Sequence, residues 1–260
     1  MVAATERDRR GLRRAGRATA LLLRELTRRA RPGATTRELD AFAAAEMRRL
    51  GTEPVFRTQN GFPGCINTSI DDEAVHGVPG DRVLRAGDLL KIDCGMRLGG
   101  YCGDATVTLP VGSADLLSAQ KRAVMETARE ALARGVATAR TGGWVGDIGE
   151  AMQRYVEGRG FNLLREDTGH GLGRRLWEAP TVPSVGWAGS GAQLVEGLVI
   201  TIEPIVVGGS PETVVAADGW TVRTADGEPA AQFEQTVLVT GDGARVLTEI
   251  GPAGVRAGRG

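Results

Sequence analysis

The sequence predicts an α+β fold in which two pseudo-symmetric halves form a central antiparallel sheet backed by helices. A weak internal repeat indicates the halves, since residues 31–51 resemble residues 140–160 at an offset of 109. Residues 87–93 likewise resemble residues 197–203 at an offset of 110. Each copy combines a helix start, an amphipathic helix and a glycine stop with a later apolar strand. Turn signals between neighbouring apolar runs predict antiparallel pairing.

The individual elements follow from hydrophobic periodicity and from the residues that interrupt it. Pro32-Gly33 separates two amphipathic helices, and a long alanine-rich helix followed by another opens the later half. Helices are expected over residues 6–30, 36–50, 114–139 and 145–159. Short apolar or alternating runs bounded by turn residues predict strands. Strands are expected near residues 54–57, 64–70, 88–95, 102–109, 161–165, 198–207, 220–223 and 232–239.

Length and composition predict one domain with one substantial core. The 260 residues are 42% hydrophobic and have a mass of 27.3 kDa. These values suit a single domain over residues 1–260. We expect residues 1–10 to form an N-terminal tail and the glycine-rich residues 251–260 to form a loose C-terminal tail.

Charge and cysteine content bear on partners and compartment. The 32 basic and 32 acidic residues cancel, which argues against a nucleic-acid partner. Acidic residues are interspersed among the arginines near the N-terminus, as on a solvated helix face. No apolar stretch approaches the roughly 20 residues that span a bilayer, so no membrane partner is expected. Cys65, Cys94 and Cys102 are odd in number and lack zinc-type spacing, which favours reduced thiols and a cytoplasmic location.

Two aspartates flank a predicted hairpin at symmetric positions. The apolar residues before Asp93 and the alternation at 106–109 indicate two strands, and Gly99-Gly100 indicates the turn between them. In a regular hairpin Asp93 and Asp104 would be opposed partners on one face, with Cβ atoms roughly 5 Å apart. Two like charges at that separation repel each other, and a divalent cation between them removes the repulsion. Two unrelated aspartates beside a turn are the alternative interpretation.

Three further side chains stand in unusual surroundings. His170 lies among glycines that leave its imidazole uncrowded. Glu203 ends an apolar run typical of a buried strand, where a carboxylate is costly unless paired or metal-bound, and Pro204 predicts that the strand stops or bulges there. Glu234 is flanked by strand-forming residues, and the turn signal at 218–219 predicts that its strand is an antiparallel neighbour of the strand of Glu203. Each alone is explained by a salt bridge to an arginine, whereas the five side chains together predict a metal site.

The ligand chemistry selects among metals. Four carboxylates and one imidazole suit Mn²⁺, Fe²⁺, Co²⁺ or Zn²⁺ in a two-metal site better than a closed structural zinc site, which favours thiolates. Five side chains supply too few ligands for two ions unless some carboxylates bridge them. A bridged pair generates a metal-bound hydroxide and stabilises a tetrahedral intermediate, so the set predicts a metal-dependent hydrolase.

Six short motifs follow one another along the chain. They are Asp-Asp-Glu-Ala-Val-His76-Gly-Val-Pro, Lys-Ile-Asp93-Cys-Gly, Gly103-Asp104-Ala-Thr, Gly169-His170-Gly-Leu-Gly, Thr201-Ile202-Glu203-Pro204 and Ala231-Gln-Phe-Glu234-Gln-Thr. In this order they resemble the type I methionine aminopeptidases of the pita-bread metallopeptidase family. The similarity runs from about residue 10 to 250 and implies the pita-bread fold.

The resemblance implies a role for each matching ligand. Asp93 would bind one ion through both oxygens, and Asp104 and Glu234 would bridge the pair. His170 and Glu203 would complete the shell of the other ion. Glu203 would also carry the proton from the nucleophilic water.

One departure from the family concerns substrate contacts. The resemblance implies that His76 donates a hydrogen bond to the scissile amide and helps the amine leave, although an ordinary exposed loop histidine is the alternative. The family usually has another histidine seven residues after the liganding one, and here that position is Trp177. An indole has one donor, no acceptor and a larger volume. Metal binding is expected to persist, while substrate positioning and cleavage rate are expected to change.

Further departures lie around the expected substrate pocket. Asn67 stands where the family often has cysteine, and Asp71 where asparagine is common. Gln59 stands where an aromatic side chain often lines the methionine pocket. Phe62 and Trp220 match pocket positions, so an apolar specificity site is expected. The changes indicate altered selectivity, and drift in a paralogue would give the same pattern.

The sequence therefore predicts a cytoplasmic, monomeric, dinuclear-metal aminopeptidase. Its substrates would be peptides or nascent chains from which it removes an N-terminal methionine or a similar apolar residue. One alternative is a paralogue whose metal site acts on a different amide or small molecule. The other alternative is a peptide-binding pseudoenzyme, which is less favoured because all five ligands are retained.

Overall fold

The computed structural model describes residues 1–249, so the expected tail at 251–260 lies outside the described residues. The helices are α1 (Glu6–Arg29), α2 (Thr36–Leu50), α3 (Val55–Asn60), the 3₁₀ turn η1 (Ala114–Leu116), α4 (Ala119–Thr138) and α5 (Val145–Gly158). The strands of the first half are β1 (Glu53–Pro54), β2 (Asn67–Ile70), β3 (Glu73–Val75), β4 (Leu89–Leu98) and β5 (Tyr101–Pro110). Those of the second half are β6 (Asn162–Leu163), β7 (Gly169–Gly171), β8 (Glu178–Val182), β9 (Val199–Ile202), β10 (Ile205–Val207), β11 (Thr213–Val215), β12 (Val222–Thr224), β13 (Ala230–Gln232), β14 (Gln235–Thr240) and β15 (Gly243–Val246).

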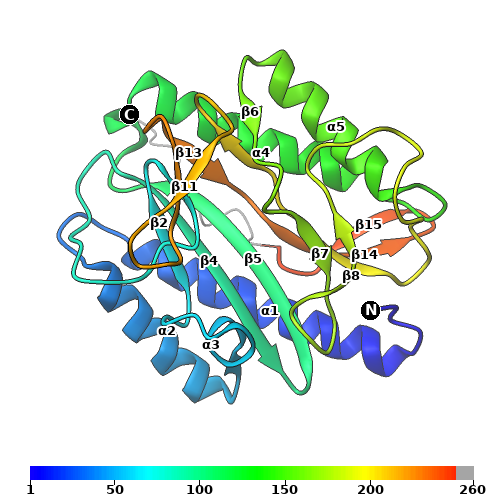
Figure 1. Ribbon diagram of the computed structural model, residues 1–260. Helices are drawn as coiled ribbons and strands as arrows, with labels where there is room; N and C mark the ends of the chain where they lie inside the picture. The colour runs from blue at the N-terminus through cyan, green and yellow to red at the C-terminus, as the bar shows by residue number, and fades with distance from the viewer. Residues whose placement is uncertain (250–260) are drawn as a thin grey trace.

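Helices back antiparallel strands in both halves, which confirms the α+β class. Buried residues of α1 and α2 join β2 and β4 in one core cluster. Buried residues of α4 and α5 join β9 and β14 in another. Helix α1 runs behind the β4–β5 hairpin (Figure 1). The two backbones approach closely at Gly103, where a Cβ atom would lie only 2.9 Å from Gly16 Cα.

The two halves repeat the same local contacts. The isolated bridge between Thr35 and Val83 in the first half has a counterpart between Trp144 and Gln193 in the second. At the start of α2 and of α5, the backbone N–H of the preceding residue donates to a carboxylate three residues later, at 2.7 and 2.8 Å. The offset of these contacts equals that of the sequence repeat, so the expected pseudo-symmetry has a structural basis.

The register of the β4–β5 hairpin differs from the expected one. Gly99 and Gly100 form a two-residue turn with positive φ. This turn pairs Asp93 with Thr106, and Asp104 with Gly95. The two aspartates are therefore diagonal neighbours on one face instead of opposed partners. Pairing Asp93 with Asp104 would require the turn to be centred one residue earlier in the chain. The turn is instead centred between Gly99 and Gly100, which shifts each strand by one residue relative to the expected register.

A seam of threonine contacts joins the halves between β5 and the β13–β14 segment. Glu234 N donates to Thr106 O at 3.0 Å, and Thr106 N donates to Glu234 O at 3.4 Å. Thr236 Oγ1 accepts from Asp104 N at 3.0 Å and donates to Asp104 O at 2.7 Å. These bonds fix Asp104 of the first half beside Glu234 of the second.

Some expected elements have other bounds or types. Residues 55–60 form α3, whereas a strand was expected near 54–57. A short apolar run fits either a strand or a single helical turn, and here Val55 and Phe56 pack as a helix against β4 at Gly95. The expected helix at 114–139 is divided into η1 and α4, because Ser118 caps α4 by accepting from Lys121 N.

The first residues of the chain are held in place instead of forming the expected tail at 1–10. Val2 forms a bridge with Leu198. Thr5 then begins α1, since its hydroxyl accepts from Asp8 N at 3.1 Å while Asp8 Oδ2 accepts from Thr5 N at 3.3 Å. This capping box satisfies two backbone donors that a tail would leave in water.

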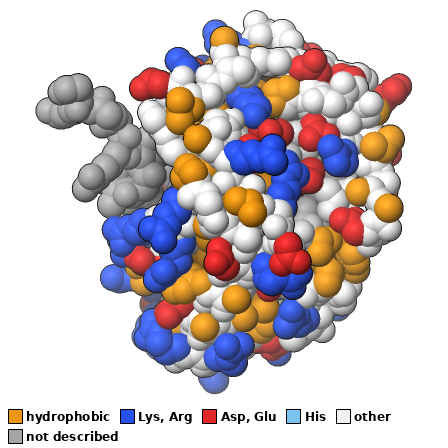
Figure 2. Space-filling view, turned by 90° about the vertical axis from the view of Figure 1, so that its left-hand side faces the viewer, with side chains coloured by type: hydrophobic (Ala, Val, Ile, Leu, Met, Phe, Trp, Pro, Cys, Tyr) orange, Lys and Arg blue, Asp and Glu red, His pale blue; other side chains and the backbone are white. Residues whose placement is uncertain are grey.

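The surface carries mixed charge. On the face shown in Figure 2, lysine and arginine side chains are interspersed with acidic ones. Several arginines form ion pairs, such as Arg28 with Glu25 at 2.7 Å and Arg49 with Glu46 at 2.7 Å. Among residues 1–249, no helix combines the length and hydropathy that crossing a bilayer requires.

Candidate metal centre

The five predicted ligands line one cavity at the junction of the two halves. The cavity has a volume of about 240 Å³. Asp93 comes from β4, Asp104 from β5 and His170 from β7. Glu203 follows β9, and Glu234 lies between β13 and β14. The folded chain thus brings together side chains that are far apart in the sequence.

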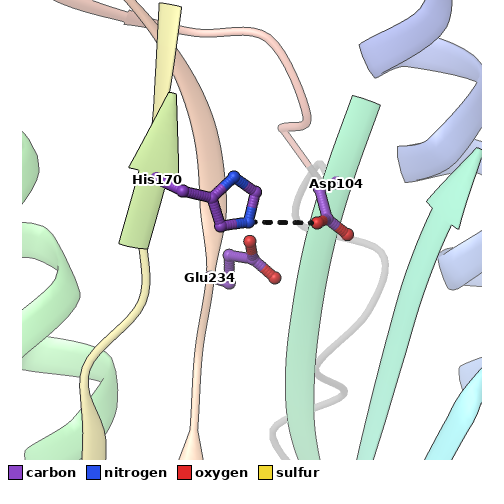
Figure 3. A group of neighbouring side chains, drawn as sticks. All are labelled: Asp104, His170 and Glu234. Carbon is purple, nitrogen blue, oxygen red and sulfur yellow. Dashed lines mark ion pairs between the residues drawn. The ribbon is translucent and has the colours of Figure 1, made fainter. Parts of the chain in front are cut away.

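Asp104, His170 and Glu234 form the tightest group, with side chains that point toward one another (Figure 3). One ligand atom from each lies within 4.8 Å of the others. His170 Nε2 lies 3.8 Å from Asp104 Oδ2 and 3.8 Å from Glu203 Oε1. These separations are too long for hydrogen bonds and leave room for an ion, which binds nitrogen and oxygen ligands at about 2.0–2.2 Å.

Glu203 and Glu234 face each other across a shared break in the strands of the second half. Strand β9 pairs with β14 before the break and β10 pairs with β13 after it, in one continuous antiparallel register. The expectation of antiparallel neighbours is confirmed. The strand also stops at Glu203 as expected, since Pro204 has no N–H to continue the ladder.

Neighbouring polar side chains hold Glu203 in a fixed orientation. Thr201 Oγ1 donates to Glu203 Oε1 at 2.9 Å, and Gln232 Nε2 donates to Glu203 Oε2 at 3.1 Å. Thr201 also accepts from the backbone N–H of His170 at 3.0 Å. The strand that ends at Glu203 therefore positions two of the five side chains.

Three buried carboxylate oxygens lack a hydrogen-bond partner among the described residues: Asp93 Oδ1, Asp104 Oδ1 and Glu234 Oε1. For two of these carboxylates the second oxygen is bonded. Asn67 Nδ2 donates to Asp93 Oδ2 at 3.1 Å, and Thr106 Oγ1 donates to Glu234 Oε2 at 2.9 Å. Unpartnered buried acceptors are rare in folded proteins, so their convergence here fits a cation.

Burial raises the pKa of all four carboxyl groups. The pKa of Asp93 rises to about 7 and that of Glu203 to about 8. The pKa values of Asp104 and Glu234 lie well above the ordinary range, first because of burial and then because neighbouring carboxylates repel them. The protein therefore concentrates carboxyl groups at a place where their charged forms are unfavourable without cations.

His170 is arranged as a neutral ligand. Burial lowers its pKa to about 4, so the ring is uncharged at neutral pH. Its Nδ1 lies 3.0 Å from Gly171 O, which favours the tautomer in which Nδ1–H donates to that carbonyl. Nε2 then directs its lone pair toward Asp104 and Glu203. Together with four carboxylates, this donor set fits two divalent cations.

Comparison with known proteins gives the family. The model of metallopeptidase family M24 matches residues 10–241. The chain belongs to family M24.

Relatives within family M24 sharpen the comparison. The chain is 41% identical to "Methionine aminopeptidase 1" of Mycobacterium tuberculosis, covering 90% of each sequence. It is 40% identical to "Methionine aminopeptidase 1" of Bacillus subtilis, covering 96% of the chain and all of the relative. The crystal structure of methionine aminopeptidase from Rickettsia prowazekii superposes with a TM-score of 0.91 at 33% identity, covering 96% of the chain and all of that structure. These matches confirm the expected resemblance and the pita-bread fold.

In this member of family M24, aromatic side chains line the wall beside the five predicted ligands. The rings of Phe62 and Trp220 meet edge to face with centroids 5.4 Å apart. Trp177 lines the same cavity, is 43% exposed, and lies 6.1 Å from the ring of His170. His76 also lines the cavity, has a φ of 56°, and has its pKa lowered by burial.

The positions of Asn67 and Gln59 differ. Asn67 lines the cavity and donates to Asp93, so its amide orients one of the predicted ligand carboxylates. Gln59 lies outside this cavity, which corrects the expectation that it lines the substrate pocket. It lines a neighbouring cavity that shares Trp177, and its Oε1 accepts from Leu176 N at 2.9 Å. The side chain of Gln59 is thus held by the loop before Trp177.

Sequence reasoning missed five other lining residues: Phe56, Asn60, Glu166, Asp167 and Thr168. Phe56 and Asn60 were not predicted to line the cavity because a strand was expected near 54–57. In the structure both residues lie in α3. Glu166, Asp167 and Thr168 directly precede the glycine-flanked His170 motif. Their position next to this predicted ligand was the one sequence signal that they line the cavity. Two of them add carboxylates to a wall that already holds four.

Proposed function

We propose that this protein is an aminopeptidase that uses two divalent cations to remove methionine from the N-terminus of peptides. The observation that carries the proposal is the convergence of five ligand side chains, three of them with unpartnered buried oxygens, in a cavity bordered by Phe62 and Trp220. Relatives named methionine aminopeptidase at about 40% identity support the substrate. Among the ions, Co²⁺, Mn²⁺, Fe²⁺ and Zn²⁺ suit a carboxylate-rich site with one imidazole.

The ligands divide between the two ions. Asp93 would hold one ion, Asp104 and Glu234 would bridge both, and His170 and Glu203 would hold the other. When bound, the ions lower the pKa of water and offset the negative charge that develops during amide hydrolysis. The apolar wall formed by Phe62 and Trp220 is suited to a methionine side chain.

Two other residues would move or hold protons. Glu203 is fixed by two hydrogen bonds and has a pKa raised to about 8, which suits a group that accepts a proton from water and returns it to the leaving amine. His76 is neutral because burial lowers its pKa. A neutral imidazole donates through one nitrogen, so His76 can hold the scissile carbonyl or amide in place.

The proposal extends to the setting of the reaction. The substrates would be peptide or nascent-chain N-termini, and the enzyme would act as a monomer in the cytoplasm. All three cysteines are buried free thiols, which supports a reducing compartment.

Hydrolysis of a short methionyl peptide tests the proposal. We expect purified protein supplied with Co²⁺ or Mn²⁺ to release methionine from Met-Ala-Ser, and chelation to stop the release. Amino-acid analysis measures the free methionine. Metal-loaded protein that releases none would refute the activity, and a substrate other than methionyl peptides would then have to be sought.

Trp177 provides a second prediction. If the indole merely replaces a group that positions the substrate, Trp177→His raises kcat/KM for methionyl peptides by about tenfold without changing metal stoichiometry. Steady-state kinetics and elemental analysis measure the two quantities. Trp187→His is the matched control, since Trp187 is 80% exposed and does not line the cavity. A Trp177→His enzyme no better than the parent would indicate that the substrate has changed.

A further inference from the structure

The wall of the candidate metal cavity holds more carboxyl groups than two divalent cations would balance. Six carboxylates line it, and four of them are the proposed ligands. The other two are Glu166 and Asp167. No lysine or arginine lines this cavity in the described part of the chain. Two divalent cations would carry four positive charges, enough to balance the four ligand carboxylates and not the other two.

Neither Glu166 nor Asp167 is neutralised by an ion pair. Within residues 1–249, no side-chain nitrogen of lysine, arginine or histidine lies within 4.0 Å of either carboxylate. Two histidines line the cavity, His76 and His170, and burial lowers the pKa of both rings, which disfavours positive charge on either. Glu166 is exposed, whereas Asp167 is partly buried.

Asp167 lines the same cavity as His76 and Glu203, the two groups of the proposed reaction that would hold or move protons. Burial lowers the pKa of His76 and raises the pKa of Asp167, and each group partly offsets the shift of the other. Asp167 therefore borders the space in which a substrate amide would lie. The same cavity contains unpartnered oxygens of Asp104 and Glu234, whose residues are only 4% and 2% exposed. Asp167 thus lies in the wall of a built binding site, and Glu166 lies at its exposed edge.

We propose that Glu166 and Asp167 form a specificity-determining wall that favours peptides with a basic side chain shortly after the scissile bond. This inference rests on the proposed aminopeptidase function and names the class of substrate within it. The apolar wall of Phe62 and Trp220 takes the first side chain, and His76 holds the scissile amide. Asp167, which lines the cavity together with His76, would then border the leaving-group side of that bond, with Glu166 at the solvent-exposed edge of the wall.

The size of the effect follows from the exposure of the groups. An exposed or partly exposed ion pair changes an affinity by a factor of about 1.4 to 5. Changing the substrate side chain from lysine to glutamate replaces an attraction with a repulsion, so the two factors multiply. The expected ratio of kcat/KM is about tenfold, and it decreases as salt screens the charges.

A series of peptides of one length tests the inference. The peptides are Met-Ala-Lys-Ala-Ser, Met-Ala-Gln-Ala-Ser and Met-Ala-Glu-Ala-Ser, each assayed with Mn²⁺-loaded enzyme at 50 and 500 mM NaCl. We expect kcat/KM to fall from the lysine to the glutamine to the glutamate peptide, over about tenfold at low salt. The order should weaken at high salt.

Matched variants assign the preference to the wall. The Glu166→Gln/Asp167→Asn double variant is expected to cleave the three peptides at equal rates, and Asp167→Glu to retain the preference. Glu126→Gln removes one exposed carboxylate from the outer helix α4 and is expected to behave as the parent. Equal rates with the parent enzyme, or a preference that survives in the double variant, would overturn the inference.

Binding provides a readout that does not depend on turnover. Equilibrium dialysis of the three peptides against metal-loaded protein should give the same order of affinity, and the double variant should abolish it. If the parent cleaves no methionyl peptide but binds the lysine peptide most tightly, the aminopeptidase proposal fails while the acidic wall stands. Binding with no charge preference refutes the wall whatever the activity.

Discussion

Replacing Glu203 with glutamine is expected to lower kcat/KM for methionyl peptides by about 10³-fold. The amide cannot accept a proton from water, and general acid–base groups contribute about 10²–10⁴. It also provides a weaker ligand beside His170 Nε2, which lies 3.8 Å from the present Oε1. Steady-state kinetics with Met-Ala-Ser at saturating Mn²⁺ measures the loss.

The structure separates this loss of activity from misfolding. Glutamine keeps the shape of Glu203 and removes a buried carboxyl whose pKa is raised to about 8, so the metal-free variant is expected to be at least as stable as the parent. Glu212→Gln provides a control, since Glu212 is exposed and lies outside the cavity. A Glu203→Gln enzyme within about threefold of the parent would exclude Glu203 as the proton carrier.

Removing the metal ions is expected to lower the melting temperature by roughly 10 °C at pH 8 and by less at pH 6. Ions present at 1,000 times their Kd stabilise the folded state by about 4 kcal/mol. Each kcal/mol shifts the melting temperature of a domain of this size by about 2–4 °C. Without ions, the folded state is more stable when the buried carboxyl groups are protonated than when they are charged. Differential scanning calorimetry with and without a chelator measures the difference.

The pH dependence has a definite sign. The pKa values of Asp93 and Glu203 are raised in the folded state to about 7 and about 8, from 3.8 and 4.5. Their contribution to the stability of the metal-free protein is therefore fully present below about pH 4 and is lost as the pH rises through 7 and 8. Asp104→Asn should raise the melting temperature of the chelated protein and reduce the effect of added metal. A larger metal effect at pH 6 than at pH 8 would contradict this account.

The sequence by itself determined the parts that depend on local chemistry. Residue types that favour helix ends, such as Ser, Thr, Gly and Pro, predicted the bounds of the principal helices to within a few residues. Each ligand stood where its own neighbours made it anomalous, such as Glu203 at the end of an apolar strand before Pro204. The repeat at an offset of about 110 indicated that two halves share one centre.

Local chemistry failed where two alternatives differ only in long-range packing. The apolar pair Val55-Phe56 fits a strand or a helical turn, and its contact with Gly95 of β4 selects the helix. The hairpin register depended on which residues occupy the turn, and a shift there moved Asp104 from opposite Asp93 to a diagonal position.

Only the tertiary structure decided which side chains share the cavity. Gln59 lines a neighbouring cavity instead, where Leu176 N, over a hundred residues later in the chain, donates to it. Glu166 and Asp167 line the wall because they directly precede β7, which brings His170 close to Asp104. No local sequence pattern connects the segments that meet there. Ligand types are dictated by the chemistry of single residues, whereas substrate selectivity depends on the charge and shape that distant segments create together.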